Sequence, residues 1–194
     1  MRIAGYDINA AKKQLILLDK LPAKKRFEWR EERKWALARF HFENNLIYRQ
    51  KVGSNLPNNW NALPIMKKDD YQKKLDKVLS KGFNKKNIYL ANTSGSSGHP
   101  FFFAKDKNAH SLTWAYIISR YNDLGIAHTD LEARFYGIPL EKKVYYFEKM
   151  KDWIFNRVRF SVFDLSPNKF KEFIIKFKNS KFKYIYGYTN SIVL

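Results

Sequence analysis

The sequence contains no cysteine, and this absence alone removes several classes of protein. Without thiols the chain forms neither disulfides nor Cys-ligated zinc or iron–sulfur sites. It also lacks an apolar run near the ~20 residues that span a bilayer. A signal-peptide pattern is missing too, because Asp19 and Lys20 follow the short apolar run 15–18, where small residues would be expected. We therefore expect a cytoplasmic protein without a transmembrane segment.

Acidic residues are scarce, with 18 Asp and Glu against 37 Lys and Arg, which gives a net charge of +19. One interpretation is a partner that carries phosphates, such as nucleic acid or an anionic membrane. The other is a solvated surface rich in lysine, which the scattered lysines and the lack of a like-charge block favour. A basic nucleic-acid-binding module remains the alternative, with Tyr184, Tyr186 and Tyr188 as stacking platforms.

What the sequence has in abundance is apolar and aromatic side chains, at 45% and 17% of the residues, enough for a domain with a core. The first part reads as a mainly helical lead-in over residues 1–85. Apolar spacing predicts a helix over 24–52, and turn formers separate it from a short helix over 68–80. The apolar face of the long helix has four members: Trp35, Ala38, Phe42 and Leu46.

From residue 86 onward the pattern changes to strands that alternate with helices. This order predicts an α/β fold, with a nucleotide-binding portion over 86–194. The expected elements are a buried strand over 88–91, a strand over 101–104, a helix over 107–124 that ends at Gly125, strands over 134–138, 157–162 and 182–186, and a helix that starts at 166–167. In the strand over 157–162, Val158 and Phe160 should face the core, and Arg157 and Arg159 should face solvent.

The end of the sequence is apolar, at Ile192, Val193 and Leu194. Natural termini are usually polar and exposed. We therefore expect the chain to be a fragment of a longer protein, incomplete at its C-terminus.

The most informative segment is the loop Thr93-Ser94-Gly95-Ser96-Ser97-Gly98-His99-Pro100, which follows a predicted strand. Its hydroxyls can donate hydrogen bonds, and its glycines let backbone N–H groups approach an anion closely. The segment is neither a Walker loop nor a Rossmann fingerprint, since neither consensus occurs in the chain. The pattern predicts a loop that holds phosphate groups.

The order of these residues resembles the signature Ser-Gly-(Ser/Thr)-(Ser/Thr)-Gly-x-Pro of adenylate-forming enzymes, which include the acyl-CoA synthetases. Within that family the chain looks most like the phenylacetate–CoA ligases and their relatives in capsular polysaccharide biosynthesis. Three further segments resemble that branch: 41–49, 63–70 and 186–191. The resemblance implies that these residues form part of the large N-terminal domain of such an enzyme.

What the resemblance implies is a two-step reaction. A small-molecule carboxylate attacks the α-phosphate of ATP to form an acyl-adenylate and pyrophosphate, and a thiol such as coenzyme A then takes the acyl group. The loop hydroxyls and amides would bind the β- and γ-phosphates together with Mg²⁺. The phosphate-binding residues would be Thr93, Ser94, Gly95, Ser96, Ser97 and Gly98.

Other positions of the family's active site are less well matched. Tyr136 and Gly137 lie where the family's aromatic residues line the acyl pocket, although a core position after a strand is the simpler interpretation. Phe101 stands where many members carry Lys. The run 186–190 also mimics the family motif Tyr-Gly-x-Thr-Glu, whose Glu helps bind Mg²⁺, but Asn190 stands in place of that Glu and the family's own copy lies further downstream, so the role is not transferred. The resemblance places the ribose-binding Asp, the hinge and the C-terminal lysine after residue 194. We therefore name no catalytic residue and expect the chain alone to be inactive.

The four histidines do not suggest a metal site. None of them forms the i, i+4 pair of a helical zinc site, so we expect no protein-bound metal and assign the histidines structural or surface roles. His99 is the exception, because it lies inside the loop within reach of a phosphate.

Overall fold

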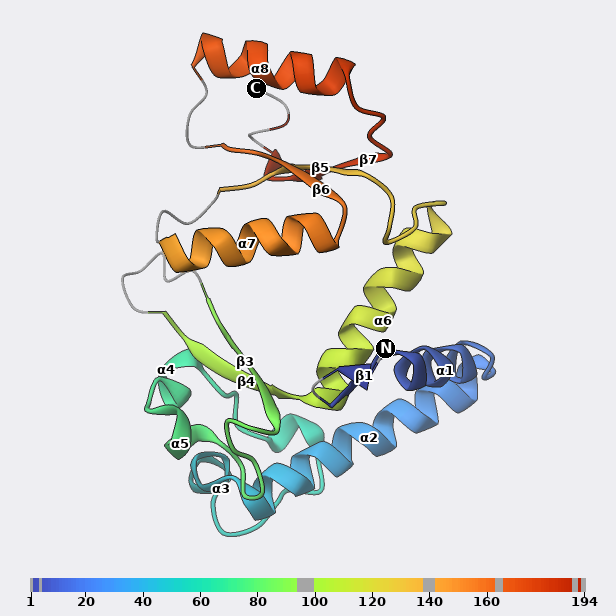
Figure 1. Cartoon of the computed structure of the whole chain (residues 1–194). Coiled ribbons are helices and arrows are strands. Elements are labelled where there is room, and N and C mark those ends of the chain that lie inside the picture. Colours follow the sequence, from blue (N-terminus) through green and yellow to red (C-terminus); the bar gives the residue numbers. More distant parts are fainter. Residues whose placement is uncertain are drawn as a thin grey trace. The chain divides into compact units, whose positions relative to one another are not determined.

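The computed structural model describes residues 2–3, 5–93, 100–137, 142–162, 166–189 and 192. Its helices and strands make a mixed α/β protein, as expected (Figure 1). The chain divides into two compact units, residues 1–116 and 117–194, and each is described by itself. A division at residue 85 and a nucleotide-binding domain after it stay predictions. In the described part of the chain, no helix combines the length and apolar character needed to cross a membrane.

The first unit opens with a small antiparallel hairpin, β1 (Arg2–Ile3) and β2 (Tyr6–Asp7), which leads into α1 (Ile8–Asp19). The Asp7 carboxylate caps α1 by accepting a hydrogen bond from the Ala10 N–H at 2.9 Å. Its own N–H donates to Ser111 Oγ at 3.2 Å, which ties the hairpin to a later helix. Helix α1 was not among the elements expected from the sequence, although Asp7 is a recognisable start signal.

The predicted helix over 24–52 is wrong as one element, because it divides into α2 (Ala23–Asn44) and α3 (Leu46–Val52). Asn45 separates the two with an extended backbone (φ −120°, ψ 112°). Its side chain caps α3 through the Tyr48 N–H and donates to the Val78 carbonyl. The break turns Leu46 outward, where it is 68% exposed, and buries Ile47 instead.

The predicted helix over 68–80 is also two shorter elements, α4 (Lys68–Tyr71) and α5 (Leu75–Val78), preceded by the 3₁₀ turn η1 (Trp60–Ala62). The backbone leaves the helical region at Gln72 (ψ 60°) and Lys74 (ψ 140°). Asp70 holds the start of α4, since its carboxylate accepts from the Lys67 N–H and from Lys51 Nζ, each at 2.7 Å. Asp70 therefore lies in the first turn of α4, near the positive end of the helix dipole.

An antiparallel hairpin follows, made of β3 (Ile88–Asn92) and β4 (Phe102–Asp106), and α6 (Lys107–Asp123) comes after it. Both strands and the helix confirm the predicted elements. The expectation of a buried strand over 88–91 is wrong, because only Ile88 is buried in β3 while Leu90 is 43% exposed. A two-stranded hairpin has too few neighbours to cover both faces. Gly125, at φ +69°, ends the helix region in the left-handed conformation.

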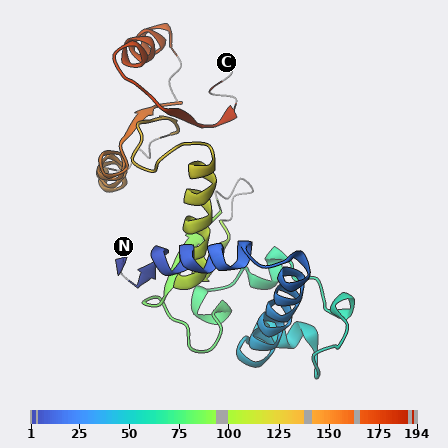
Figure 2. The ribbon, with the colours of Figure 1, turned by 90° about the vertical axis from the view of Figure 1, so that its right-hand side faces the viewer.

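The second unit is a three-stranded parallel sheet with helices on its two faces. The strands β5 (Glu132–Phe135), β6 (Arg157–Phe160) and β7 (Tyr184–Gly187) lie in the order β6-β5-β7. The helices α7 (Lys142–Ile154) and α8 (Pro167–Lys178) form the crossovers. Figures 1 and 2 show α7 and α8 on opposite sides of the sheet. Of these elements only α7 was not predicted.

Phenylalanine side chains form the core on the α8 face of this sheet. Phe160 is fully buried and packs edge-on against Phe173 of α8, with the ring centroids 5.0 Å apart. Phe135 stacks on Phe160 at 4.8 Å. On α8, Phe173 is buried, whereas Ile174 is 53% exposed.

The expectation that Arg157 and Arg159 face solvent is wrong. Only 15% and 3% of their side-chain surfaces are exposed. Parallel sheets carry crossover helices on both faces, so the second face of β6 is covered as well. Here α7 provides that cover, and its acidic side chains pair with Arg159.

Candidate functional site

The Ser/Gly segment lies between the two strands of the β3–β4 hairpin. At the base of the connection, the Thr93 N–H donates to the Phe101 carbonyl at 2.9 Å. The Phe101 N–H donates in return to Thr93 Oγ1 at 3.0 Å. These reciprocal bonds hold both ends of the connection at one place, and Thr93 accepts through its oxygen without using its hydroxyl hydrogen.

Of the predicted phosphate-binding residues, Thr93 is described and is exposed. Ser94, Gly95, Ser96, Ser97 and Gly98, with His99, lie outside the described residues. The pairing of β3 with β4 runs from Ile88–Asp106 to Asn92–Phe102 and places the segment after the last pair. Lys105 and Lys107, the first lysines after the segment, therefore lie toward the other end of the hairpin.

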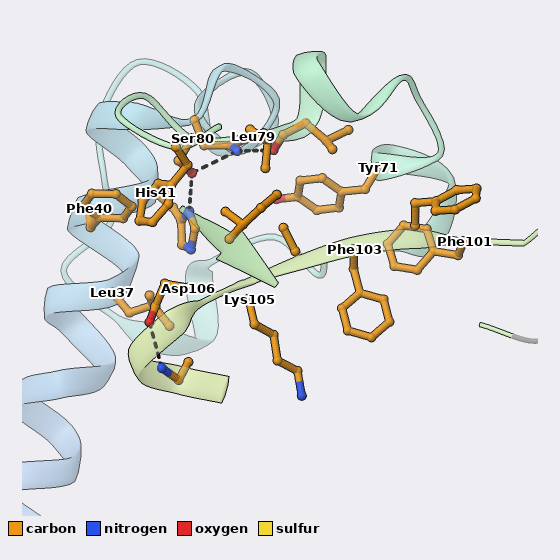
Figure 3. A pocket seen from close by; sticks show the side chains of 17 residues that line it. Leu37, Phe40, His41, Tyr71, Leu79, Ser80, Phe101, Phe103, Lys105 and Asp106 are labelled. Atoms are coloured by element: carbon orange, nitrogen blue, oxygen red, sulfur yellow. Dashed lines mark hydrogen bonds between the residues drawn. The ribbon is translucent and has the colours of Figure 1, made fainter. Parts of the chain in front are cut away.

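A cavity of about 660 Å³ adjoins β4 within the first unit (Figure 3). Its wall is mainly apolar and includes Phe40, Phe83 and residues 101–104. The size and the lining resemble those of small-molecule pockets. Sequence reasoning did not predict this cavity, because its wall combines residues from α2, from the segment 71–83 and from β4.

One polar part of the cavity wall is a cluster of His41, Asn45 and Ser80, and the other polar side chains that line it are Tyr71, Lys105 and Asp106. The His41 Nδ1 atom lies 3.0 Å from Ser80 Oγ, and Asn45 Nδ2 donates to the same oxygen at 3.2 Å (Figure 3). Burial lowers the pKa of His41, so its ring is neutral at neutral pH. Across the cavity, burial and the neighbouring Tyr48 and Asp70 raise the pKa of Tyr71. The cluster offers neutral hydrogen-bonding groups beside an apolar wall.

The second unit places the other predicted residues at the carboxyl ends of its strands. Tyr136 follows β5 and stacks on Tyr188, which follows β7, with ring centroids 4.3 Å apart. Tyr186 lies 6.2 Å from Tyr136 in a parallel orientation. A hydrogen bond with Tyr188, and then burial, raises the pKa of Tyr136. Ligands of parallel α/β sheets bind at this edge, so Tyr136 occupies a position that can contact one.

Arg159 of β6 holds the backbone that follows β5 at this end of the sheet. Its guanidinium donates to the Gly137 carbonyl at 3.1 Å and to both Asp152 oxygens at 2.8 Å. Arg159 therefore holds the Gly137 carbonyl in place next to Tyr136. Ile138 and the family-like residues Asn190 and Ser191 lie outside the described residues.

At the amino-terminal end of the central strand β5, Glu132 is buried among charged and hydrogen-bonding partners. It accepts from the Tyr184 hydroxyl at 2.7 Å and pairs with Arg134 and Arg157. Burial and then this hydrogen bond raise the pKa of Tyr184. Because its hydroxyl is bonded to the buried Glu132, Tyr184 is unsuited to stacking on a ligand.

Within the described ranges, no group of three or more His, Cys, Asp or Glu side chains gathers in a way that could hold a metal ion. Comparison of the chain with protein-family models, with curated proteins and with solved structures found no match in any of the three.

Proposed function

We propose that the chain binds ATP with Mg²⁺ through residues 93–98, as part of an enzyme that activates a small carboxylate as its acyl-adenylate. The observation that carries the proposal is the sequence of the run from Thr93 to Pro100, which connects two paired strands. Backbone N–H groups and hydroxyls in such a run suit phosphate oxygens. The paired base at Thr93 and Phe101 holds the ends of the run in place, which lowers the entropic cost of binding.

Two further features support the same proposal. The parallel sheet with helices on both faces suits a ligand at its carboxyl edge, where Tyr136 and Gly137 lie. A planar acyl group could stack on the Tyr136–Tyr188 pair. Transfer to a thiol such as coenzyme A would follow the resemblance of the sequence to acyl-CoA ligases.

The first test is calorimetric titration of Mg·ATP into the chain and into a Ser96→Ala/Ser97→Ala variant. We expect the variant to bind at least about tenfold more weakly, because each hydrogen bond to a charged phosphate contributes about 1.5–3 kcal/mol. Ser54→Ala, in an exposed turn of the same unit, is the control and should bind like the wild type. Unchanged affinity in the loop variant, or no binding by the wild type, refutes the proposal.

Pyrophosphate release by the gene product is the second readout, with a panel of carboxylates. Release that depends on a carboxylate and disappears in the loop variant supports adenylate formation. ATP binding without any carboxylate-dependent release would confine the proposal to nucleotide binding.

A second candidate function is nucleic-acid binding, which the exposure of two tyrosines favours. Tyr186 and Tyr188 are 41% and 51% exposed, and the Arg134 guanidinium lies 4.8 Å from the Tyr186 ring. Bases stack on such platforms. Oligonucleotide binding with a steep salt dependence, lost in Tyr186→Ala/Tyr188→Ala, would favour this function if Mg·ATP does not bind.

A further inference from the structure

Helix α7 turns acidic side chains toward the sheet and large apolar side chains away from it, which is the reverse of the usual arrangement. A helix that covers a sheet normally turns its apolar side inward. In α7 the inward side chains include Glu148 and Asp152, which pair with Arg159 at 3.0 and 2.8 Å. Asp152 is only 5% exposed. Charge pairing, in addition to apolar packing, therefore holds α7 on the sheet.

The large apolar side chains of α7 remain exposed. They form what we call the aromatic face of α7: Tyr146 (71% exposed), Phe147 (53%), Met150 (49%), Trp153 (84%) and Ile154 (57%). Their spacing of three, four and seven residues places them on one side of the helix. Contiguous exposed apolar surface of this kind marks an interaction site.

The charge next to this face is positive. Lys149 and Lys151 flank the face, whereas the two acidic residues of α7, Glu148 and Asp152, lie inward and pair with the buried Arg159. The Lys151 ammonium, bonded to Glu148, also lies 4.5 Å from the Phe147 ring centroid, and Lys149 Nζ lies 5.8 Å from that of Tyr145. Lysines of this type bury their methylene groups and keep their charge at an interface with water.

The composition and the charge of the aromatic face of α7 favour one kind of binding partner over two others. A second copy of the chain carries the same net charge of +19 and would be repelled. Nucleic acid would use the lysines and aromatic rings but not Met150 and Ile154. A membrane interface accepts Trp, Tyr and aliphatic side chains together, and anionic headgroups attract the adjacent lysines. We propose that the aromatic face of α7 binds an anionic lipid membrane surface, with the helix lying in the plane of the interface.

Cosedimentation with lipid vesicles tests this proposal with the intact chain. The vesicles contain phosphatidylcholine alone or with about 30% phosphatidylglycerol, since anionic lipid supplies the electrostatic attraction. We expect the wild type to bind the anionic vesicles much more strongly than the neutral ones. A Tyr146→Ser/Trp153→Ser variant should lose about tenfold or more in partitioning, because it removes two large apolar groups from the contact.

Matched controls use apolar residues that are equally exposed elsewhere. Ile65 and Leu124 are 81% and 75% exposed and lie outside α7, so Ile65→Ser/Leu124→Ser should bind vesicles like the wild type. Circular dichroism of each variant confirms that a change in binding does not come from unfolding. Equal losses in both double variants would overturn the proposal.

The absence of cysteine permits a direct readout of insertion. An environment-sensitive dye on Ile154→Cys should shift to the blue with anionic vesicles, whereas the same dye on Lys178→Cys of α8 should not. No vesicle binding by the wild type, equal binding to neutral vesicles, or no shift at residue 154 overturns the proposal. Self-association that Tyr146→Ser/Trp153→Ser abolishes would assign the face to a second copy instead.

Discussion

Gly187 shows how a single residue sets the spacing of two strands. It is the last residue of β7 and pairs with Phe135 of β5. A Cβ at this position would lie 2.6 Å from Phe135 Cβ and 3.0 Å from the Phe135 carbonyl carbon. Contacts this short to backbone atoms are relieved only by moving one strand away from the other. The pairing of β7 with β5 therefore depends on glycine at this position.

Gly187→Ala should lower the free energy of unfolding by about 1–3 kcal/mol, because the added methyl group forces the strands apart. Urea unfolding followed by circular dichroism measures the change. Asn179→Ala, an exposed substitution in the same unit, should stay within about 0.5 kcal/mol of the wild type. Equal stability of Gly187→Ala and the wild type would show that the strands accommodate the methyl group.

At the scale of elements, ion pairs hold helix α7 against the sheet. The Arg159 side chain is 3% exposed and connects Glu148 and Asp152 of α7 with the Gly137 carbonyl after β5. Burial acts to raise the pKa of Glu148, but Lys151 and Arg159 outweigh it and hold that pKa below its ordinary value. The hydrogen bonds that Arg159 donates to Asp152 raise the pKa of Arg159.

Arg159→Leu should destabilise the protein by about 3–5 kcal/mol, because it leaves Asp152 buried without its cationic partner. Glu172→Ala removes one partner of an exposed pair, Lys169–Glu172, and should change stability by less than about 1 kcal/mol. Acid titration gives a second readout of the same contact. The depressed pKa of Glu148 provides stability above about pH 4.3 that is lost as the pH falls, so this dependence should be weaker in Arg159→Leu. Similar losses of stability in Arg159→Leu and Glu172→Ala would contradict this account.

For the whole molecule, the dominant electrostatic feature is the net charge of +19 on 194 residues. Like charges spread over a folded surface repel each other and favour the expanded chain. Salt screens this repulsion, since the Debye length falls from about 30 Å at 0.01 M to about 10 Å at 0.1 M ionic strength. The folded protein should therefore be more stable in salt.

The urea midpoint of unfolding should rise as sodium chloride increases from about 0.01 to 0.5 M, because screening acts mostly on the compact state. A Lys85→Gln/Lys86→Gln variant, which removes two exposed charges, should show a smaller rise. A midpoint that falls with salt would show that ion pairs such as those of Arg159 outweigh the general repulsion.

The sequence by itself determined the local elements and the segment that suggests chemistry. Periodicity predicted α6 and α8, Gly125 marked the end of the α6 region, and the run Thr93–Pro100 was recognised between two strands that do pair. These features depend on residues a few positions apart, and their side-chain pattern and backbone preferences are written locally. The strand expected over 134–138 is present as β5 but lies at Glu132–Phe135, so Tyr136 follows it.

Only the tertiary structure decided which side chains meet. Asn45 breaks the long helix because its side-chain amide donates a hydrogen bond to the carbonyl of Val78, which lies 33 residues later. Arg159 is buried because α7 covers it and supplies its partners Glu148 and Asp152, and Arg157 is withdrawn from solvent beside Glu132 of β5. The cavity beside β4 includes His41 because α2 contributes to its wall. Such contacts join residues far apart in the chain, and their energies exceed the local preferences that a sequence pattern reports.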